Sequence, residues 1–84
     1  MNHTMEVKNE AKPLGRYIVA DPKICQGQPT FRGTRIFVEE VLEQTASGMT
    51  GEALIEERHG NITQAAIAEA MQLANQFLLK QVEA

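Results

Sequence analysis

The spacing of the apolar residues changes at Val38, and this change constrains the fold more than any other feature of the sequence. Before Val38 the apolar residues fall in short runs, such as residues 17–20, that are separated by proline and glycine. From Val38 onward they recur every three to four residues, which is the spacing of amphipathic helices. The sequence therefore predicts a mainly α chain with a small β element ahead of its helices.

The β element is expected over residues 16–37. Residues 17–20 are β-prone and end at Asp21 and Pro22, since proline offers no backbone donor to a sheet; we expect Asp21 to cap a turn. Residues 30–36 contain Gly33, and glycine tolerates the positive φ that tight hairpins require. We therefore expect a small hairpin or bulged ribbon at residues 30–36. Residues 1–15 are polar and aperiodic, so they are predicted to form a flexible tail.

Three helices are expected at about 38–47, 50–59 and 64–82. Gly48 and Gly60 are predicted to follow the first two helices at the C′ position, where glycine is favoured. Thr50 and Thr63 are predicted N-caps of the last two helices. The last helix carries an apolar stripe longer than two short helices can cover, so its end is predicted to serve an interface. The stripe comprises Ile67, Ala70, Met71, Ala74, Phe77, Leu78 and Val82.

The chain has 84 residues and a single cysteine, which indicates one small domain, expected over residues 16–84, without an internal disulfide. A domain of this size has a modest core and often depends on a partner subunit, so we expect a homodimer. The sequence offers no Cys/His cluster for a structural zinc ion, and no cofactor or metal is expected. No apolar run approaches the roughly 20 residues of a membrane span, and we expect a cytoplasmic protein without membrane contact.

The formal net charge of −3 is unevenly distributed. Residues 1–36 contain six basic and three acidic residues, a net charge of +3, whereas residues 37–84 contain two basic and eight acidic residues, a net charge of −6. A polyanion should therefore meet the first part of the chain and a basic partner the second. The pairs Glu39/Glu43 and Glu52/Glu56 are four residues apart, so their repulsion would also favour a basic partner.

Residues 21–36 read DPKICQGQPTFRGTRI and resemble the signature of the domain of unknown function 433 family. The resemblance covers about residues 17–80 and continues through Val38, Val41 and Leu42. It implies a three-helix, homeodomain-like (helix-turn-helix) bundle with an N-terminal β-hairpin element, in a bacterial or archaeal protein. Members of this family are often encoded beside a PIN-like ribonuclease toxin and are regarded as its antitoxin. Phe37 departs from the family pattern, which commonly has proline there, and replaces a residue preset for the first helical turn by an apolar anchor.

Two functional hypotheses follow. The first is a non-catalytic antitoxin that binds and neutralises a PIN-like ribonuclease toxin, with autoregulation by DNA binding as a further expectation. Its candidate partner-binding residues are Glu52, Glu56, Phe77, Leu78 and Val82. The alternative is a helix-turn-helix DNA-binding regulator without a toxin partner. Its candidate DNA-binding residues are Arg16, Lys23, Arg32, Arg35, Thr63, Gln64 and Gln72.

Electrostatics weaken a simple recognition-helix interpretation, because the helix at 64–82 has one lysine and DNA affinity comes chiefly from phosphate neutralisation. For Arg32 and Arg35 three interpretations stay open: phosphate contact, docking to a partner, or a structural role in which they tie the hairpin to Asp21 or to Glu39 and Glu40. No catalytic residue is predicted. Cys25 is expected to be a small buried apolar residue, and His59 a favourable cation near the end of a helix.

Overall fold

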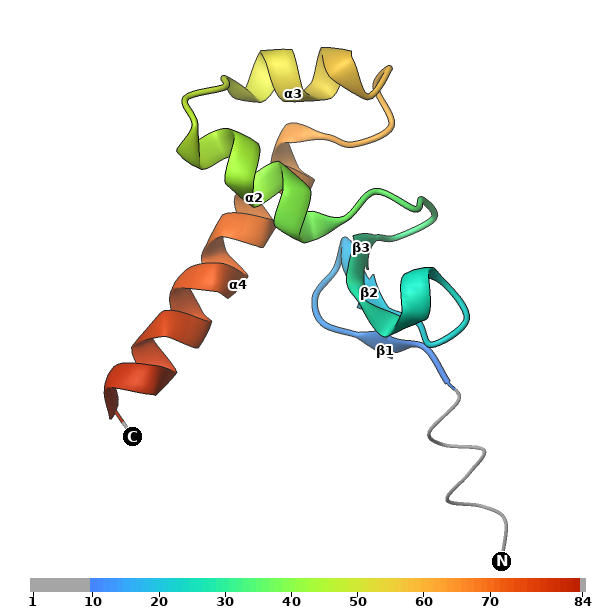
Figure 1. The fold of residues 1–84 in the computed structure, drawn as a ribbon, viewed down its shortest axis with the longest axis vertical. Helices are drawn as coiled ribbons and strands as arrows, with labels where there is room; N and C mark the ends of the chain where they lie inside the picture. Colours follow the sequence, from blue (N-terminus) through green and yellow to red (C-terminus); the bar gives the residue numbers. More distant parts are fainter. Residues whose placement is uncertain (1–9, 84) are drawn as a thin grey trace, which may run out of the picture.

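The fold of residues 10–83 is described by a computed structural model; the part of the predicted tail at residues 1–9 lies outside the described residues, as does Ala84. Three short strands come first, β1 (Lys12–Pro13), β2 (Ile18–Ala20) and β3 (Pro29–Phe31), with a 3-10 turn, η1 (Cys25–Gly27), between the last two. The helices follow: α2 (Val38–Ala46), α3 (Gly51–Glu57) and α4 (Gln64–Glu83). The chain is therefore mainly α with a small β element, as the change of apolar spacing predicts (Figure 1).

The strands form an antiparallel sheet in the order β1-β2-β3. Ile18 pairs with Phe31 and Val19 with Thr30, so the long hairpin runs between β2 and β3 across the Asp21 turn. Asp21 caps that turn as predicted, because its Oδ1 accepts a hydrogen bond from the Lys23 N–H at 2.9 Å. The predicted hairpin at residues 30–36 is reduced to a tight turn, which the isolated bridge between Thr30 and Phe37 closes.

Strand β1 makes the predicted tail shorter than residues 1–15. Lys12 pairs with Ala20 and Pro13 with Val19, and the N–H groups of Leu14 and Gly15 both donate to the carbonyl of Ile18, at 2.9 and 3.2 Å. An edge strand of two exposed residues has no apolar periodicity of its own, so the sequence pattern carries no sign of it. Only its backbone pairing with β2 places this segment in the sheet.

Cys25 lies in η1 and is half-buried, so the prediction of a buried apolar residue is wrong. Cys25 and Gln26 both adopt positive φ, 51° and 60°, and the following Gly27 has a φ of 84°. These three residues of left-handed conformation form a tight turn, in which the thiol of Cys25 stays close to the surface. The Cys25 Sγ contacts the Arg35 carbonyl at 3.9 Å.

Local signals in the sequence set the helix ends. The Oγ1 atoms of Thr50 and Thr63 accept hydrogen bonds from the N–H groups of Ala53 and Ala66, both at 3.1 Å, as predicted for N-caps. Helix α2 closes with a Schellman motif around Gly48, whose φ is 102°.

Helix α3 closes in the same way, but one residue earlier than predicted. His59, with a φ of 56°, occupies C′ in place of Gly60: the His59 N–H donates to the Glu56 carbonyl and the Gly60 N–H to the Ile55 carbonyl. His59 is among the residue types that tolerate the left-handed region, which lets the chain turn before Gly60.

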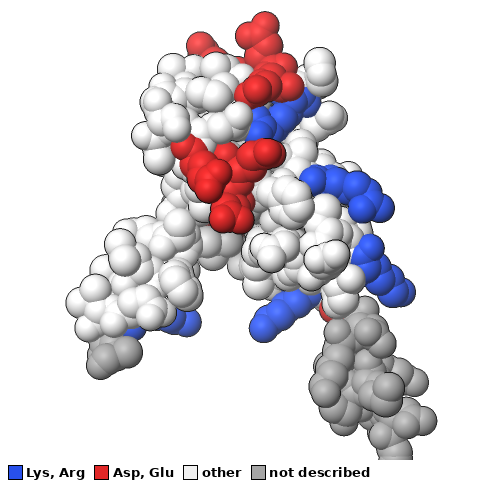
Figure 2. Space-filling view, viewed as in Figure 1, with Lys and Arg blue, Asp and Glu red and all other residues white. Residues whose placement is uncertain are grey.

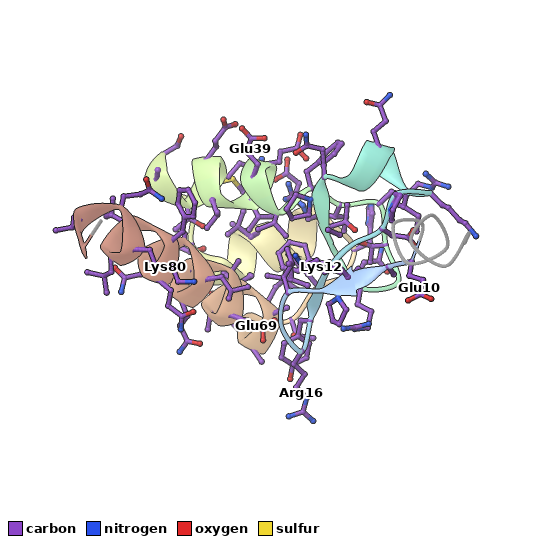
Figure 3. The ribbon with its side chains drawn as sticks, turned by 90° about the horizontal axis from the view of Figure 1, so that it is seen from below. Glu10, Lys12, Arg16, Glu39, Glu69 and Lys80 are labelled. Carbon is purple, nitrogen blue, oxygen red and sulfur yellow. The ribbon has the colours of Figure 1, made fainter. Side chains whose placement is uncertain are left out.

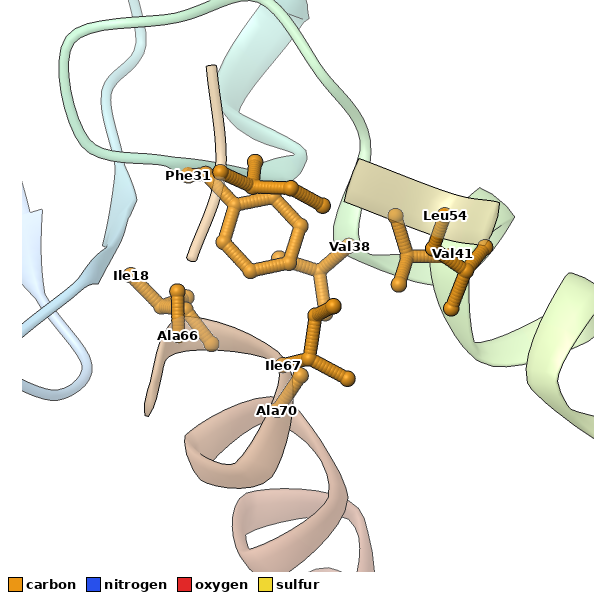
Figure 4. Packing of buried hydrophobic residues seen from close by; sticks show 9 residues of the cluster. Ile18, Phe31, Val38, Val41, Leu54, Ala66, Ile67 and Ala70 are labelled. Atoms are coloured by element: carbon orange, nitrogen blue, oxygen red, sulfur yellow. The ribbon is translucent and has the colours of Figure 1, made fainter. Parts of the chain in front are cut away.

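The core lies where the sheet meets the first half of α4 (Figure 4). The sheet supplies Ile18 and Phe31, which are 1% and 2% exposed. The helices and the segment before α4 supply the remaining residues of the core cluster: Val38, Val41, Leu54, Ile62, Ala66, Ile67 and Ala70. Helix α4 continues past this core toward the C-terminus (Figure 1). Among residues 10–83, no helix is both long enough and apolar enough to cross a membrane.

Candidate functional site

Four of the seven predicted DNA-binding residues gather around the turn between α3 and α4. Arg16, Arg32 and Thr63 line one hollow of about 200 Å³, together with Asn61 of the turn. Arg35 lines a neighbouring hollow that also includes Asn61. The fold thus brings basic residues from distant parts of the sequence to the start of α4, where the helix dipole also favours anions.

The other three residues lie apart from this group. Lys23 is exposed in the loop after β2, and Gln72 is exposed two turns along α4. The Gln64 side chain lies close to Gly51, where an added Cβ would come within 2.6 Å of its Oε1. Gln64 therefore packs against the start of α3, and Gly51 leaves the room that this packing needs.

The loop at residues 15–17 is held from two sides. The Glu69 carboxylate accepts hydrogen bonds from the backbone N–H groups of Arg16 and Tyr17, both at 2.7 Å. On the other side, Arg32 donates from Nε to the Arg16 carbonyl at 3.1 Å and from Nη2 to the Gly15 carbonyl at 3.2 Å. Arg32 therefore has the structural role that was one of the open interpretations, although its partners are backbone carbonyls rather than Asp21, Glu39 or Glu40.

Arg16 keeps its charged group in solvent, and its guanidinium lies 5.8 Å from the centroid of the Tyr17 ring. Figure 3 shows Arg16 projecting away from the ribbon, with Glu69 nearby on α4. The sequence pattern gives no sign of this role of Glu69. No spacing rule could have found that role, because the partners of Glu69 are backbone groups 52 and 53 residues away.

Glutamates of α2 and α3 form an acidic face, which Figure 2 shows as red side chains over these two helices. It consists of Glu39, Glu40, Glu43, Glu52, Glu56 and Glu57, all of them exposed. Within it, Arg58 pairs with Glu40 at 3.6 Å and with Glu57 at 3.4 Å, and it also donates to the Gln44 Oε1 at 2.6 Å. Among the described residues the remaining four glutamates of this face have no ion-pair partner.

The predicted partner-binding residues separate into two surfaces. Glu52 and Glu56 belong to the acidic face on α3, whereas Phe77, Leu78 and Val82 lie on the far half of α4 (Figure 1). These three apolar side chains are 65%, 60% and 76% exposed. The structure therefore does not combine charge and apolar contact in one patch. In the part of the chain that the structure describes, no group of three His, Cys, Asp or Glu residues is arranged to hold a metal ion.

Comparison with known proteins identifies the family of this chain. It has no significant match among curated proteins or among solved structures. Residues 18–74, more than half of the chain, match the family described as Protein of unknown function (DUF433). The match begins at β2, includes β3, α2 and α3, and ends within α4 ahead of Phe77. The chain therefore belongs to the DUF433 family of proteins of unknown function.

Proposed function

We propose that this protein is the antitoxin component of a toxin-antitoxin pair, a non-catalytic cytoplasmic protein that binds and neutralises a PIN-like ribonuclease. The observation that carries the proposal is the acidic face on α2 and α3. A ribonuclease must present a positively charged surface to its polyanionic substrate. Four carboxylates without ion-pair partners, spread over two rigid helices, complement such a surface and would compete with RNA for it.

Complementary charge of this kind accelerates association and selects the partner. In this proposal the repulsion within the pairs Glu39/Glu43 and Glu52/Glu56 is relieved when basic side chains of the ribonuclease lie between the carboxylates. Binding would therefore supply the positive charges that these carboxylates lack as partners in the free protein. Arg58 neutralises only the side of the face next to Glu40 and Glu57.

The test is co-expression with the product of an adjacent gene, followed by affinity capture and a ribonuclease assay. A stable complex with lost nuclease activity is expected. The double variant Glu52→Gln, Glu56→Gln should raise the dissociation constant of that complex on the order of 10-fold or more, because close charge pairs across an interface contribute strongly.

The matched control is the double variant Gln72→Lys, Asn75→Lys. It changes the net charge by the same two units, but on α4 and away from the acidic face. The control should bind the ribonuclease as the unchanged protein does. The proposal fails if no neighbouring gene product forms a stable complex, or if both double variants weaken the complex equally.

DNA binding is a second candidate function, favoured by the gathering of Arg16, Arg32, Arg35 and Thr63 around the turn that precedes α4. In this candidate function α3, the turn and α4 act as a helix-turn-helix, with the start of α4 entering the major groove. The basic groups of the β element would then hold the phosphates that α4 itself cannot neutralise. The same protein could bind its own promoter and also neutralise a toxin.

Arg16→Ala tests this second function, because the Arg16 side chain is exposed and only its backbone groups hold the loop. In a salt-titrated shift assay on the upstream region, the variant should bind less tightly and lose about one unit of salt slope. Lys80→Ala, which removes the same charge at the far end of α4, should leave binding unchanged. Absence of any binding by the unchanged protein at about 50 mM salt contradicts the hypothesis, since electrostatic affinity is highest there.

A further inference from the structure

We propose that the far half of α4 is a self-association surface, at which a second copy of this chain packs against the first. The α4 extension is defined here as residues 71–83, the part of α4 beyond the core residue Ala70. Its apolar face consists of Met71, Ala74, Phe77, Leu78 and Val82. The inference is independent of the ribonuclease proposal, because it concerns a different surface.

Exposure of large apolar side chains is the first observation. Met71, Phe77, Leu78 and Val82 are 45%, 65%, 60% and 76% exposed. An aromatic side chain buries 150–250 Å² when fully covered, so Phe77 alone leaves on the order of 100 Å² in solvent. Together with its neighbours it forms a patch of several hundred Å², a size that on a monomer marks an interaction site.

The spacing of these residues fits packing by a second helix. Met71, Ala74, Leu78 and Val82 follow one another at intervals of three or four residues, and Phe77 lies beside them on the same side. Ala74 leaves room at the centre of the face for two helix axes to approach closely. The 13 residues of the extension span about 20 Å, which gives three to four turns of contact.

Charge decides which partner covers this face. The apolar face itself contains no charged residue, whereas six exposed glutamates lie on α2 and α3. A basic ribonuclease therefore finds no complementary charge on the apolar face. Two copies related by a two-fold axis present the same uncharged apolar face to each other, and such a contact needs no charge to match.

A hollow adjoins the apolar face at Phe77. Leu14 and Leu73 line it together with Gln76, Phe77 and Lys80, and its volume is about 330 Å³. Leu14 is itself 37% exposed. Phe77 belongs both to the face and to this hollow, so the apolar surface of α4 continues past the face at Phe77.

The test is sedimentation equilibrium of the full chain with Leu78→Glu and its matched control Leu79→Glu. Both substitutions place a carboxylate at an exposed leucine of α4, but Leu79 lies about 110° from the centre of the apolar face. We expect the unchanged protein and Leu79→Glu to be dimers. Leu78→Glu should raise the dimer dissociation constant on the order of 100-fold, because two buried carboxylates per dimer lose their hydration.

The two proposals fail on different results. The variant Glu52→Gln, Glu56→Gln should remain a dimer even if it no longer binds a ribonuclease. A monomer at about 100 µM, well above typical micromolar affinities, overturns the self-association proposal. Equal weakening of the dimer by Leu78→Glu and Leu79→Glu is the second contradictory outcome.

Discussion

Replacing Phe31 with alanine is expected to lower the free energy of unfolding by about 4 kcal/mol, the largest effect of any single substitution considered for this chain. Phe31 is 2% exposed and lies between the sheet and the helices, close to Ile18 and Val38 (Figure 4). Truncation removes the apolar contacts of its ring and leaves a cavity that the short strands cannot close. Urea unfolding followed by circular dichroism measures the loss.

Phe37→Ala is the matched control, because the same substitution occurs six residues away at a side chain that is 38% exposed. Phe37 precedes α2 as its N-cap residue and makes no side-chain cap hydrogen bond. We expect the loss of the Phe37 ring to lower the free energy of unfolding by about 1 kcal/mol, because this ring buries less apolar area on folding than the ring of Phe31 does. Similar losses in the two variants would mean that Phe31 is not at the centre of the core.

Glu69→Gln is expected to lower the free energy of unfolding by about 2 kcal/mol. The Glu69 carboxylate accepts the N–H groups of both Arg16 and Tyr17, each at 2.7 Å. Glutamine has nearly the same shape but offers one acceptor oxygen, so its amide N–H₂ would face one of these two donors. One of the two hydrogen bonds is lost, which leaves its N–H donor without a partner, and the other is no longer charge-assisted.

Glu43→Gln is the control for charge. Glu43 is exposed on α2 and lies four residues from Glu39, so removing its charge should change the free energy of unfolding by less than about 0.5 kcal/mol. Hydrogen exchange of the Arg16 and Tyr17 amides provides a second readout, and both amides should exchange faster in Glu69→Gln alone. Unchanged exchange at these two amides would show that the carboxylate does not hold the loop.

The helices and their ends follow from signals that lie within a few residues of one another. Thr50 and Thr63 cap helices because a side-chain oxygen meets an N–H three residues ahead, and Gly48 ends α2 because it accepts a positive φ. The end of α3 differs from the prediction for a reason of the same local kind: His59 tolerates the left-handed region, so the turn comes one residue before Gly60.

The fold groups the candidate functional residues differently from the two hypotheses drawn from the sequence. The candidate residues Glu52 and Phe77 belong to the same partner-binding hypothesis, yet the fold places them on separate surfaces. In contrast, Arg16 and Arg32 come together with Thr63 in one hollow, although the chain between them folds into most of the molecule. Sequence spacing along one helix predicts a shared face, but it carries no information about which elements meet.

The sequence by itself determined the mainly α class, the caps of the helices, the acidic character of α2 and α3 and the free apolar end of α4, because each depends on residue type and short-range spacing. Only the tertiary structure decided that β1 joins the sheet, that Glu69 and Arg32 hold the loop at residues 15–17, and that the acidic face and the α4 extension are separate surfaces. These features depend on backbone groups, which every residue carries alike, and on contacts between distant segments, so no local pattern in the sequence encodes them.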